Sequence, residues 1–151
     1  IRDRNHVDEF GYVSRYDTLK APILMNRLKN LNSIISKRRK NAKLYKKLIN
    51  NPNVILPDET KFEYNTYHTF IIQVKKRSKL IEYLNRNGIS TAIHYPIPIH
   101  LQKAYKKKFK KKLYLPNTIK QSKEILSLPI NQFLKYQEIK YISEKINNFY
   151  K

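Results

Sequence analysis

The chain has 151 residues, a length that fits one domain with a sizeable hydrophobic core. It has no cysteine, which excludes disulfides and thiolate metal sites and suits a reducing compartment such as the cytoplasm. No apolar run approaches the roughly 18 residues of a membrane-spanning helix, so we expect no membrane segment. The chain starts with Ile1 and a polar, loop-like run, so we expect a piece of a longer protein.

The formal net charge is +21, from 32 lysine and arginine residues against 11 aspartate and glutamate residues. Such a charge attracts nucleic acids, anionic membranes or phosphorylated substrates. Because lysine dominates and is spread along nearly every element, the coding bias of an AT-rich genome explains most of it. In the densest basic run, residues 105–113, aromatic residues alternate with lysines, as in nucleic-acid-binding segments. A solvated loop is the simpler interpretation, and a basic nucleic-acid-binding module stays an alternative.

A long helix is predicted over residues 17–50, with Asp17 or Thr18 as its N-cap and Pro22 near its first turn. Apolar residues at steps of three and four form one seam, which only Arg38 interrupts. The seam consists of Leu24, Leu28, Leu31, Ile35, Ala42, Tyr45 and Ile49. Such a seam is ordinarily core packing.

After a loop with a short extended piece at residues 54–56, a strand is predicted over residues 67–75. Its alternation places His68 on the same face as Phe70, Ile72 and Val74. A single histidine on an apolar strand face is more often buried and hydrogen-bonded than a ligand, so we expect a structural role for it. A helix over residues 78–86 follows.

The stretch of residues 88–100 holds one of the two glycines and two of the four histidines. Gly88 is expected to end the preceding helix in a left-handed conformation. A strand is predicted over residues 89–95, ended by Pro96, which lacks a backbone donor. It would deliver His94 and Tyr95 to a strand tip, with their side chains on opposite faces. A structural histidine beside a turn and a functional histidine are both open at this point.

The remaining elements are predicted as helices over residues 101–108, 117–125 and 135–150 and a strand over 126–130. Their order predicts an α/β fold, with a long N-terminal helix and a short sheet of about three strands covered by helices. Glycines only at positions 11 and 88 exclude a glycine-rich phosphate loop. No metal-binding histidine pair or nucleophile elbow occurs either, so no catalytic residue and no metal ligand is assigned.

Two stretches carry a family resemblance. Residues 11–24, GYVSRYDTLKAPIL, are similar to the GYNSRLDELQAAIL segment of the DegT–DnrJ–StrS group of pyridoxal-phosphate-dependent sugar-nucleotide aminotransferases. Residues 88–105, GISTAIHYPIPIHLQKAY, resemble that family's GI-x-T-x-x-HYP-x-P-x-H-x-Q-x-AY. The LSLP at residues 126–129 and the His-x-Phe at residues 68–70 add to the likeness. The order and spacing of these motifs make the resemblance specific.

The resemblance implies the small C-terminal domain of a fold-type I aminotransferase. Residues 1–16 would end the large-domain segment, 17–50 would form the interdomain helix, and 51–151 the small domain. The large domain, which would precede this chain, would hold most of the pyridoxal 5'-phosphate contacts. The enzyme would transfer an amino group, from a donor such as glutamate, to a nucleotide-linked keto-deoxy sugar for surface-polysaccharide or glycan biosynthesis. It would act as a cytoplasmic homodimer; a non-catalytic remnant is another alternative.

The resemblance also assigns residues. His94, Tyr95 and Arg15 are expected to bind substrate. The family's Asn in GYNSR commonly reaches the cofactor phosphate of the neighbouring subunit, and Val13 replaces it here, which leaves Ser14 as the expected cofactor-binding residue. Pro22, where the family usually has Ala, is a second departure. The family's Schiff-base lysine and the acid that pairs with the pyridine nitrogen are not found, so the chain alone is expected to be inactive.

Overall fold

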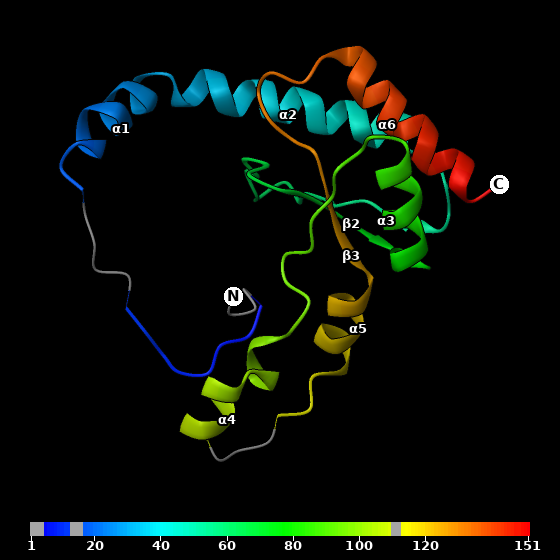
Figure 1. Ribbon diagram of the computed structural model, residues 1–151. Helices are drawn as coiled ribbons and strands as arrows, with labels where there is room; N and C mark the ends of the chain where they lie inside the picture. The colour runs from blue at the N-terminus through cyan, green and yellow to red at the C-terminus, as the bar shows by residue number, and fades with distance from the viewer. Residues whose placement is uncertain (1–4, 13–16, 110–112) are drawn as a thin grey trace.

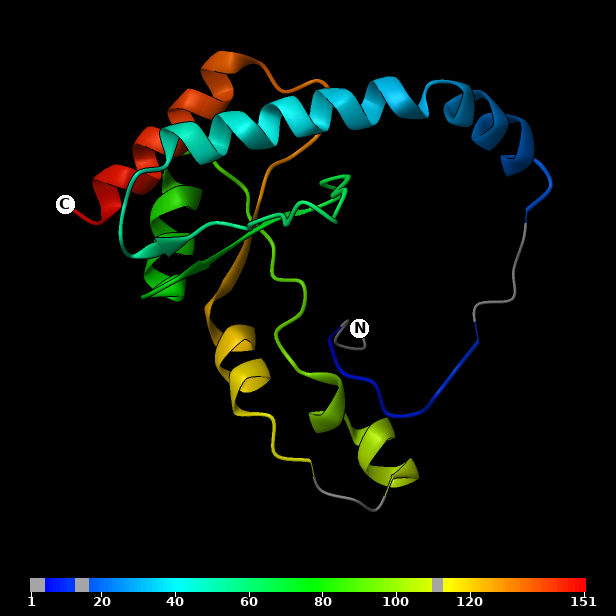
Figure 2. The ribbon, with the colours of Figure 1, turned by 180° about the vertical axis from the view of Figure 1, so that it is seen from behind.

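A computed structural model describes residues 5–12, 17–109 and 113–151 and has an α/β fold, as predicted. The first half contains α1 (Lys20–Lys29), α2 (Leu31–Leu48), β1 (Val54–Ile55), β2 (Phe70–Val74) and α3 (Arg77–Arg86). The second half contains the 3₁₀ helix η1 (Ile99–Leu101), α4 (Lys103–Lys108), α5 (Pro116–Glu124), β3 (Ile125–Leu128) and α6 (Tyr136–Phe149). Figures 1 and 2 show α1 and α2 as one long arc, with α6 beside the C-terminal half of α2.

The three strands form an antiparallel sheet in the order β1–β2–β3. The central strand alternates as predicted, and Phe70, Ile72 and Val74 are buried. These side chains share one core with buried residues of α2, α3 and α6, so the three helices cover that face of the sheet. The helical members of this core are Ala42, Tyr45, Leu80, Leu84, Ile139, Ile142 and Ile146.

The predicted long helix is divided into α1 and α2 at Asn30. The Asn30 side chain donates to the Asn26 carbonyl (3.2 Å), and its backbone N–H donates to the Arg27 carbonyl (3.1 Å). Asparagine competes in this way with the regular helical pattern, which explains an interruption of one residue. Pro22 lies in the first turn of α1, where its missing N–H costs nothing. Among its described residues α1 buries none, so only α2 contributes to the core.

The prediction of a strand over residues 89–95 is wrong. Gly88 ends α3 in the left-handed region as predicted (φ 72°), but the following segment pairs with β3 only through Ala92 and Ser127. The next pairing positions along this edge of β3 are Ile125 and Pro129. Pro129 has no N–H, and the carbonyl of Ile125 accepts from the Arg77 side chain (3.3 Å). A single backbone bridge therefore replaces the predicted strand.

The prediction that His68 is buried is also wrong. The strand begins only at Phe70, His68 is exposed, and Tyr67 is buried in its place. Tyr67 has a left-handed backbone (φ 48°), which breaks the alternation just before the strand. Tyr67 and Phe70 therefore both face the core, with ring centroids 6.0 Å apart.

Residues 5–12 form no helix or strand and run along α4, as Figures 1 and 2 show. The Val7 N–H donates to the Gln102 side chain (3.0 Å), and the Ala104 N–H donates to the Val7 carbonyl (2.9 Å). Phe10 packs edge-on against Phe109, with ring centroids 6.3 Å apart.

Among the residues described, no helix has the length and apolar content needed to cross a membrane.

Core packing leads to a first prediction. Leu80 is 0% exposed, so Leu80→Ala should lower the free energy of unfolding by about 2–5 kcal/mol through lost contacts and a residual cavity. The matched control is Ile55→Ala on β1, because Ile55 is 61% exposed. This substitution should lower the free energy of unfolding by less than about 0.5 kcal/mol. Urea unfolding followed by circular dichroism measures both. Equal costs for the two variants would contradict this description of the core.

Candidate functional site

A row of side-chain donors on α2 holds the segment that follows β3. The Tyr45 hydroxyl donates to the Pro129 carbonyl (2.9 Å), Arg38 Nη1 to the Ile130 carbonyl (3.3 Å) and Asn41 Nδ2 to the Asn131 carbonyl (2.8 Å). The donors are spaced at i, i+3 and i+7, so they share one face of the helix. Burial raises the pKa of Tyr45 above its ordinary value, which keeps its hydroxyl protonated and able to donate.

Arg38 also holds the chain that leads into β2, the strand next to β3 in the sheet. The same nitrogen, Nη1, contacts the carbonyls of Tyr67 (3.0 Å) and His68 (3.1 Å). The approach to β2 and the exit from β3 are thereby fixed to a single side chain. This explains why an arginine interrupts the apolar seam of the helix.

His94 is held against β3 by its own contact with Ser127 and by two backbone hydrogen bonds between Ala92 and Ser127. The Ala92 N–H donates to the Ser127 carbonyl (3.2 Å), and the Ser127 N–H donates to the Ala92 carbonyl (2.8 Å). Two residues further on, His94 Nδ1 lies 2.8 Å from Ser127 Oγ, and Ser127 is 6% exposed. Which of the two atoms donates depends on the tautomer of the ring. The contact fixes the imidazole and leaves Nε2 for another partner.

His94 and His68 line the same hollow of about 300 Å³. Its walls come from three segments, which are the approach to β2, the segment after Gly88 and the end of β3 with its exit. The lining residues are His68, Thr69, Ser90, Thr91, Ala92, His94, Ser127, Leu128, Pro129 and Ile130. Thr91 Oγ1 is buried without a hydrogen-bond partner among the described residues. The hollow thus combines two imidazoles with several hydroxyl groups, and its volume is at the low end of ligand pockets.

Tyr95 lies apart from this hollow. It is 69% exposed and lines two other hollows, beside η1 and α4. Its ring meets that of His94 edge to face, with centroids 5.4 Å apart. The structure therefore places His94 and Tyr95, two of the three predicted substrate-binding residues, in different hollows. Arg15, Ser14 and the departure at Val13 fall outside the described residues.

Sequence reasoning missed Ser127 and Arg38 as parts of this site. The LSLP motif marked the segment that contains Ser127, but its contact with His94 depends on how residues 90–94 cross the sheet edge. Arg38 was visible only as a gap in an apolar seam. The signal available was the polar spacing of Arg38, Asn41 and Tyr45 on one helix face.

The described hollow does not fit a covalently bound pyridoxal phosphate. Such a site needs a lysine for the Schiff base and an acid for the pyridine nitrogen. Neither a lysine nor an acidic residue is among the residues that line the hollow around His94. Its imidazole and hydroxyl groups can form hydrogen bonds with a polar ligand.

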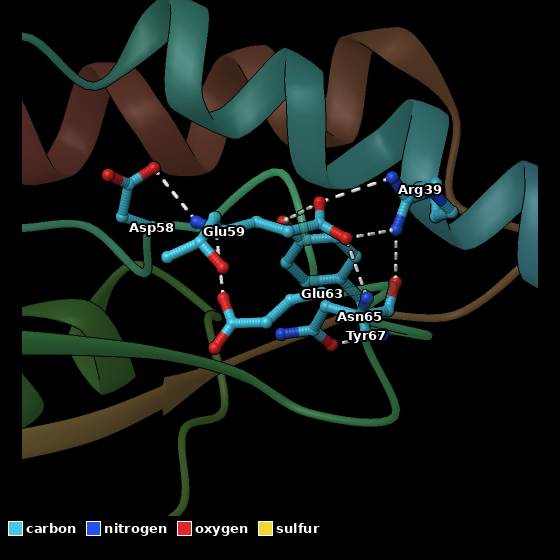
Figure 3. A network of polar contacts seen from close by, with 7 residues as sticks. Arg39, Asp58, Glu59, Glu63, Asn65 and Tyr67 are labelled. Carbon is cyan, nitrogen blue, oxygen red and sulfur yellow. Dashed lines mark hydrogen bonds and ion pairs between the residues drawn. The ribbon is translucent and has the colours of Figure 1, made fainter.

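A second polar network fixes the loop between β1 and β2 to α2 (Figure 3). Arg39 forms a two-pronged ion pair with Glu59, with N–O distances of 2.7 and 3.1 Å, and donates to the Asn65 carbonyl (2.6 Å). The Asn65 N–H donates back to Glu59 (2.6 Å). The Arg39 guanidinium also lies 4.2 Å above the Tyr64 ring. This network supports the stretch of chain that leads to His68.

Comparison with known proteins identifies the family. Residues 2–147 match the DegT/DnrJ/EryC1/StrS aminotransferase family. A pleiotropic regulatory protein of Geobacillus stearothermophilus is 36% identical over 144 residues, which is 93% of this chain and 39% of that protein. A dTDP-3-amino-3,6-dideoxy-alpha-D-galactopyranose transaminase of Aneurinibacillus thermoaerophilus is 35% identical over 139 residues, covering 92% of this chain and 38% of that protein.

The fold comparison agrees. The S. venezuelae DesV structure in complex with a ketimine intermediate superposes with a TM-score of 0.83 at 27% identity, over 99% of this chain and 40% of that chain. The chain therefore belongs to the DegT/DnrJ/EryC1/StrS aminotransferase family, and the resemblance seen in residues 11–24 and 88–105 is confirmed. The chain spans about two fifths of the length of the relatives it matches.

The Arg39 network predicts a pH dependence. Hydrogen bonds from Arg39, and then from the Asn65 N–H, hold the pKa of the Glu59 carboxyl below its usual value of 4.5. Because the pKa of Glu59 is lower in the folded than in the unfolded state, its carboxylate stabilises the fold at any pH above the unfolded-state pKa. This stabilisation is lost as the pH falls from the unfolded-state pKa through the folded-state pKa. Glu59→Gln should therefore lower the melting temperature at pH 7, and the difference should shrink below about pH 4.5.

The matched control is Glu82→Gln, because Glu82 forms an exposed pair with Arg86 on α3. Exposed pairs contribute little, so this variant should melt close to the unchanged protein at both pH values. Thermal unfolding at a series of pH values measures both variants. A Glu59→Gln deficit that persists unchanged at pH 3 would contradict the charge-based explanation.

Proposed function

We propose that this chain is part of an aminotransferase that moves an amino group, from a donor such as glutamate, onto a nucleotide-linked keto-deoxy sugar. Family membership supports the reaction class. The transaminase names of relatives such as that of Aneurinibacillus thermoaerophilus support a nucleotide sugar as the acceptor. The structural observation that carries the proposal is His94, fixed by Ser127 in a polar hollow that it shares with His68.

His94 binds the acceptor in this proposal. Because Ser127 engages Nδ1, the Nε2 atom is left to hydrogen-bond a sugar hydroxyl or an oxygen of the diphosphate. That contact orients the keto-sugar for amino transfer, which is a positioning role. Thr91 and His68 offer further polar contacts in the same hollow. Tyr95 and Arg15 remain proposed substrate-binding residues, and of these Tyr95 lines other hollows than His94 does.

The cofactor is proposed to be pyridoxal 5'-phosphate, which supplies the electron sink for amino transfer. The lysine that holds it would belong to a large domain preceding this chain, with residues 1–16 ending that part, 17–50 joining it and 51–151 forming the small domain. Ser14 would reach the cofactor phosphate of a neighbouring subunit in a cytoplasmic homodimer. The product would feed surface-polysaccharide or glycan biosynthesis. A spore coat polysaccharide biosynthesis protein of Bacillus subtilis, 26% identical, supports this use.

The apolar face of α1 supports a packing role for the long arc. Met25 is 65% exposed and Leu28 is 67% exposed, and both line a hollow of about 680 Å³ along α1 and the start of α2. Exposed apolar surface of this extent marks an interaction site. In this proposal, the face packs on the large domain or on a second subunit.

A kinetic test addresses His94. In the intact enzyme, His94→Ala should lower kcat/KM for the keto-sugar by about tenfold to a hundredfold, the scale of one or two lost polar contacts. Turnover of the amino donor alone should be nearly unchanged, because the donor does not use this contact. Single-turnover kinetics with each substrate separates the two.

Ser127→Ala is the companion variant, because it frees the imidazole without removing it. It should lower keto-sugar turnover by less than His94→Ala, about threefold to tenfold, the scale of one hydrogen bond. Equal damage to donor and acceptor turnover by His94→Ala would assign His94 to cofactor support or to the fold. No effect on either would leave it a structural histidine beside a turn.

The apolar face has its own test. The chain alone should bind a dye specific for exposed apolar surface, or self-associate, and Met25→Lys/Leu28→Lys should suppress both. The matched control is Lys79→Gln on α3, which changes a charge away from this face. Dye fluorescence and light scattering report the result. A monodisperse, dye-silent monomer would contradict the proposed packing role.

A further inference from the structure

We propose that a groove on the outer side of α2 binds a nucleoside diphosphate or triphosphate, at a site separate from the His94 hollow. The groove has a volume of about 510 Å³ and lies between α2 and the segment that leads into α6. It is lined by Lys37, Lys40, Asn41, Lys43, Leu44, Lys47, Gln132, Leu134 and Tyr136. Figures 1 and 2 show this segment passing beside α2 before α6 begins.

One wall of the groove is a row of positive charges. Lys37, Lys40, Lys43 and Lys47 come from about three turns of α2, and all four side chains are exposed. None of the nine lining residues is acidic. Elsewhere on the described surface, Lys103 is paired with Asp8 at 3.3 Å. A concave surface with four like charges and no acid of its own attracts a ligand with several negative charges.

The opposite wall is neutral and partly apolar. Leu134 is half-buried, and Tyr136, the first residue of α6, is 54% exposed. Leu44 of α2 also lines the groove and adds apolar surface. The groove therefore fits a ligand that carries negative charge at one end and a flat, weakly polar group at the other. A nucleotide has this form, with phosphates for the ammonium groups and a base that stacks on the tyrosine.

The size of the groove favours a nucleotide over a macromolecule. Small-molecule pockets range from about 300 to 1,000 Å³, and this volume is within that range. An acidic helix or a nucleic acid would need a longer continuous surface. Asn41, whose side chain holds the Asn131 carbonyl (2.8 Å), lines the groove, so this wall is fixed in place without a ligand.

Photolabelling of the intact protein locates the site. With 8-azido-ADP as the probe, label should be recovered in the peptide that contains residues 132–136, and excess ADP should suppress it. Label recovered only elsewhere would overturn the proposal. Because no residue that lines the His94 hollow also lines the groove, His94→Ala should leave this label unchanged.

Matched variants test the chemistry. Lys40→Gln/Lys47→Gln should weaken ADP binding by about thirtyfold, since each lost charge–phosphate contact costs about fivefold or more. Lys79→Gln/Lys123→Gln removes the same charge from exposed positions on α3 and α5, outside the groove, and should weaken it less than about twofold. Tyr136→Leu should weaken ADP binding by about fivefold while leaving inorganic pyrophosphate binding unchanged.

Three results would overturn the proposal. The first is an equal loss in both lysine pairs, which would mean attraction by net charge alone. The second is no difference between ADP and pyrophosphate in their response to Tyr136→Leu. The third is displacement of ADP by a polyglutamate peptide or a single-stranded oligonucleotide at lower concentration than by unlabelled ADP. Isothermal titration calorimetry at two salt concentrations measures these affinities.

Discussion

The structure depends on α2, which packs against the apolar core and also donates hydrogen bonds to the backbone that follows β3. Along α2, Ala42 and Tyr45 fill the core, while Arg38, Asn41 and the Tyr45 hydroxyl donate to three consecutive carbonyls, of residues 129–131. Backbone carbonyls that leave a sheet and are covered by a helix need donors, and leaving them unpaired is costly. The exit of β3 is therefore held in one position, and both hollows with binding chemistry lie along it.

This arrangement explains how residues from distant parts of the chain form a rigid polar hollow. The wall at residues 127–130 is fixed from behind by α2 and from the side by β2, so His94 is held against a serine that cannot move away. The approach to His68 is fixed by Arg38 and by the Arg39–Glu59 network. A hollow built in this way would need little reorganisation to bind a ligand, which supports the proposed positioning role of His94.

The lysines of the chain fall into two groups, those with a partner on the surface and those that line the groove on α2. Several lysines are paired or lie over aromatic rings, as Lys103 does with Asp8 and Lys108 with Phe10. Composition alone accounts for these, because they are spread over many elements. The row along α2 differs, since it faces a concave surface that contains no acid. Only a specific three-dimensional arrangement distinguishes a binding groove from a basic surface.

The sequence by itself determined the family, the α/β class, the helices of the second half and the left-handed Gly88, because motif spacing, helical periodicity and glycine are local signals. It predicted a strand over residues 89–95 and a buried His68, and both predictions were wrong. Pro129 has no N–H and the Ile125 carbonyl is already bonded, so residues 89–95 cannot extend the pairing, and the left-handed backbone of Tyr67 turns His68 outward. Only the tertiary structure decided that Ser127 meets His94 and that Arg38 joins two loops. These contacts join residues far apart in the chain, and no local pattern encodes which partner a side chain will meet.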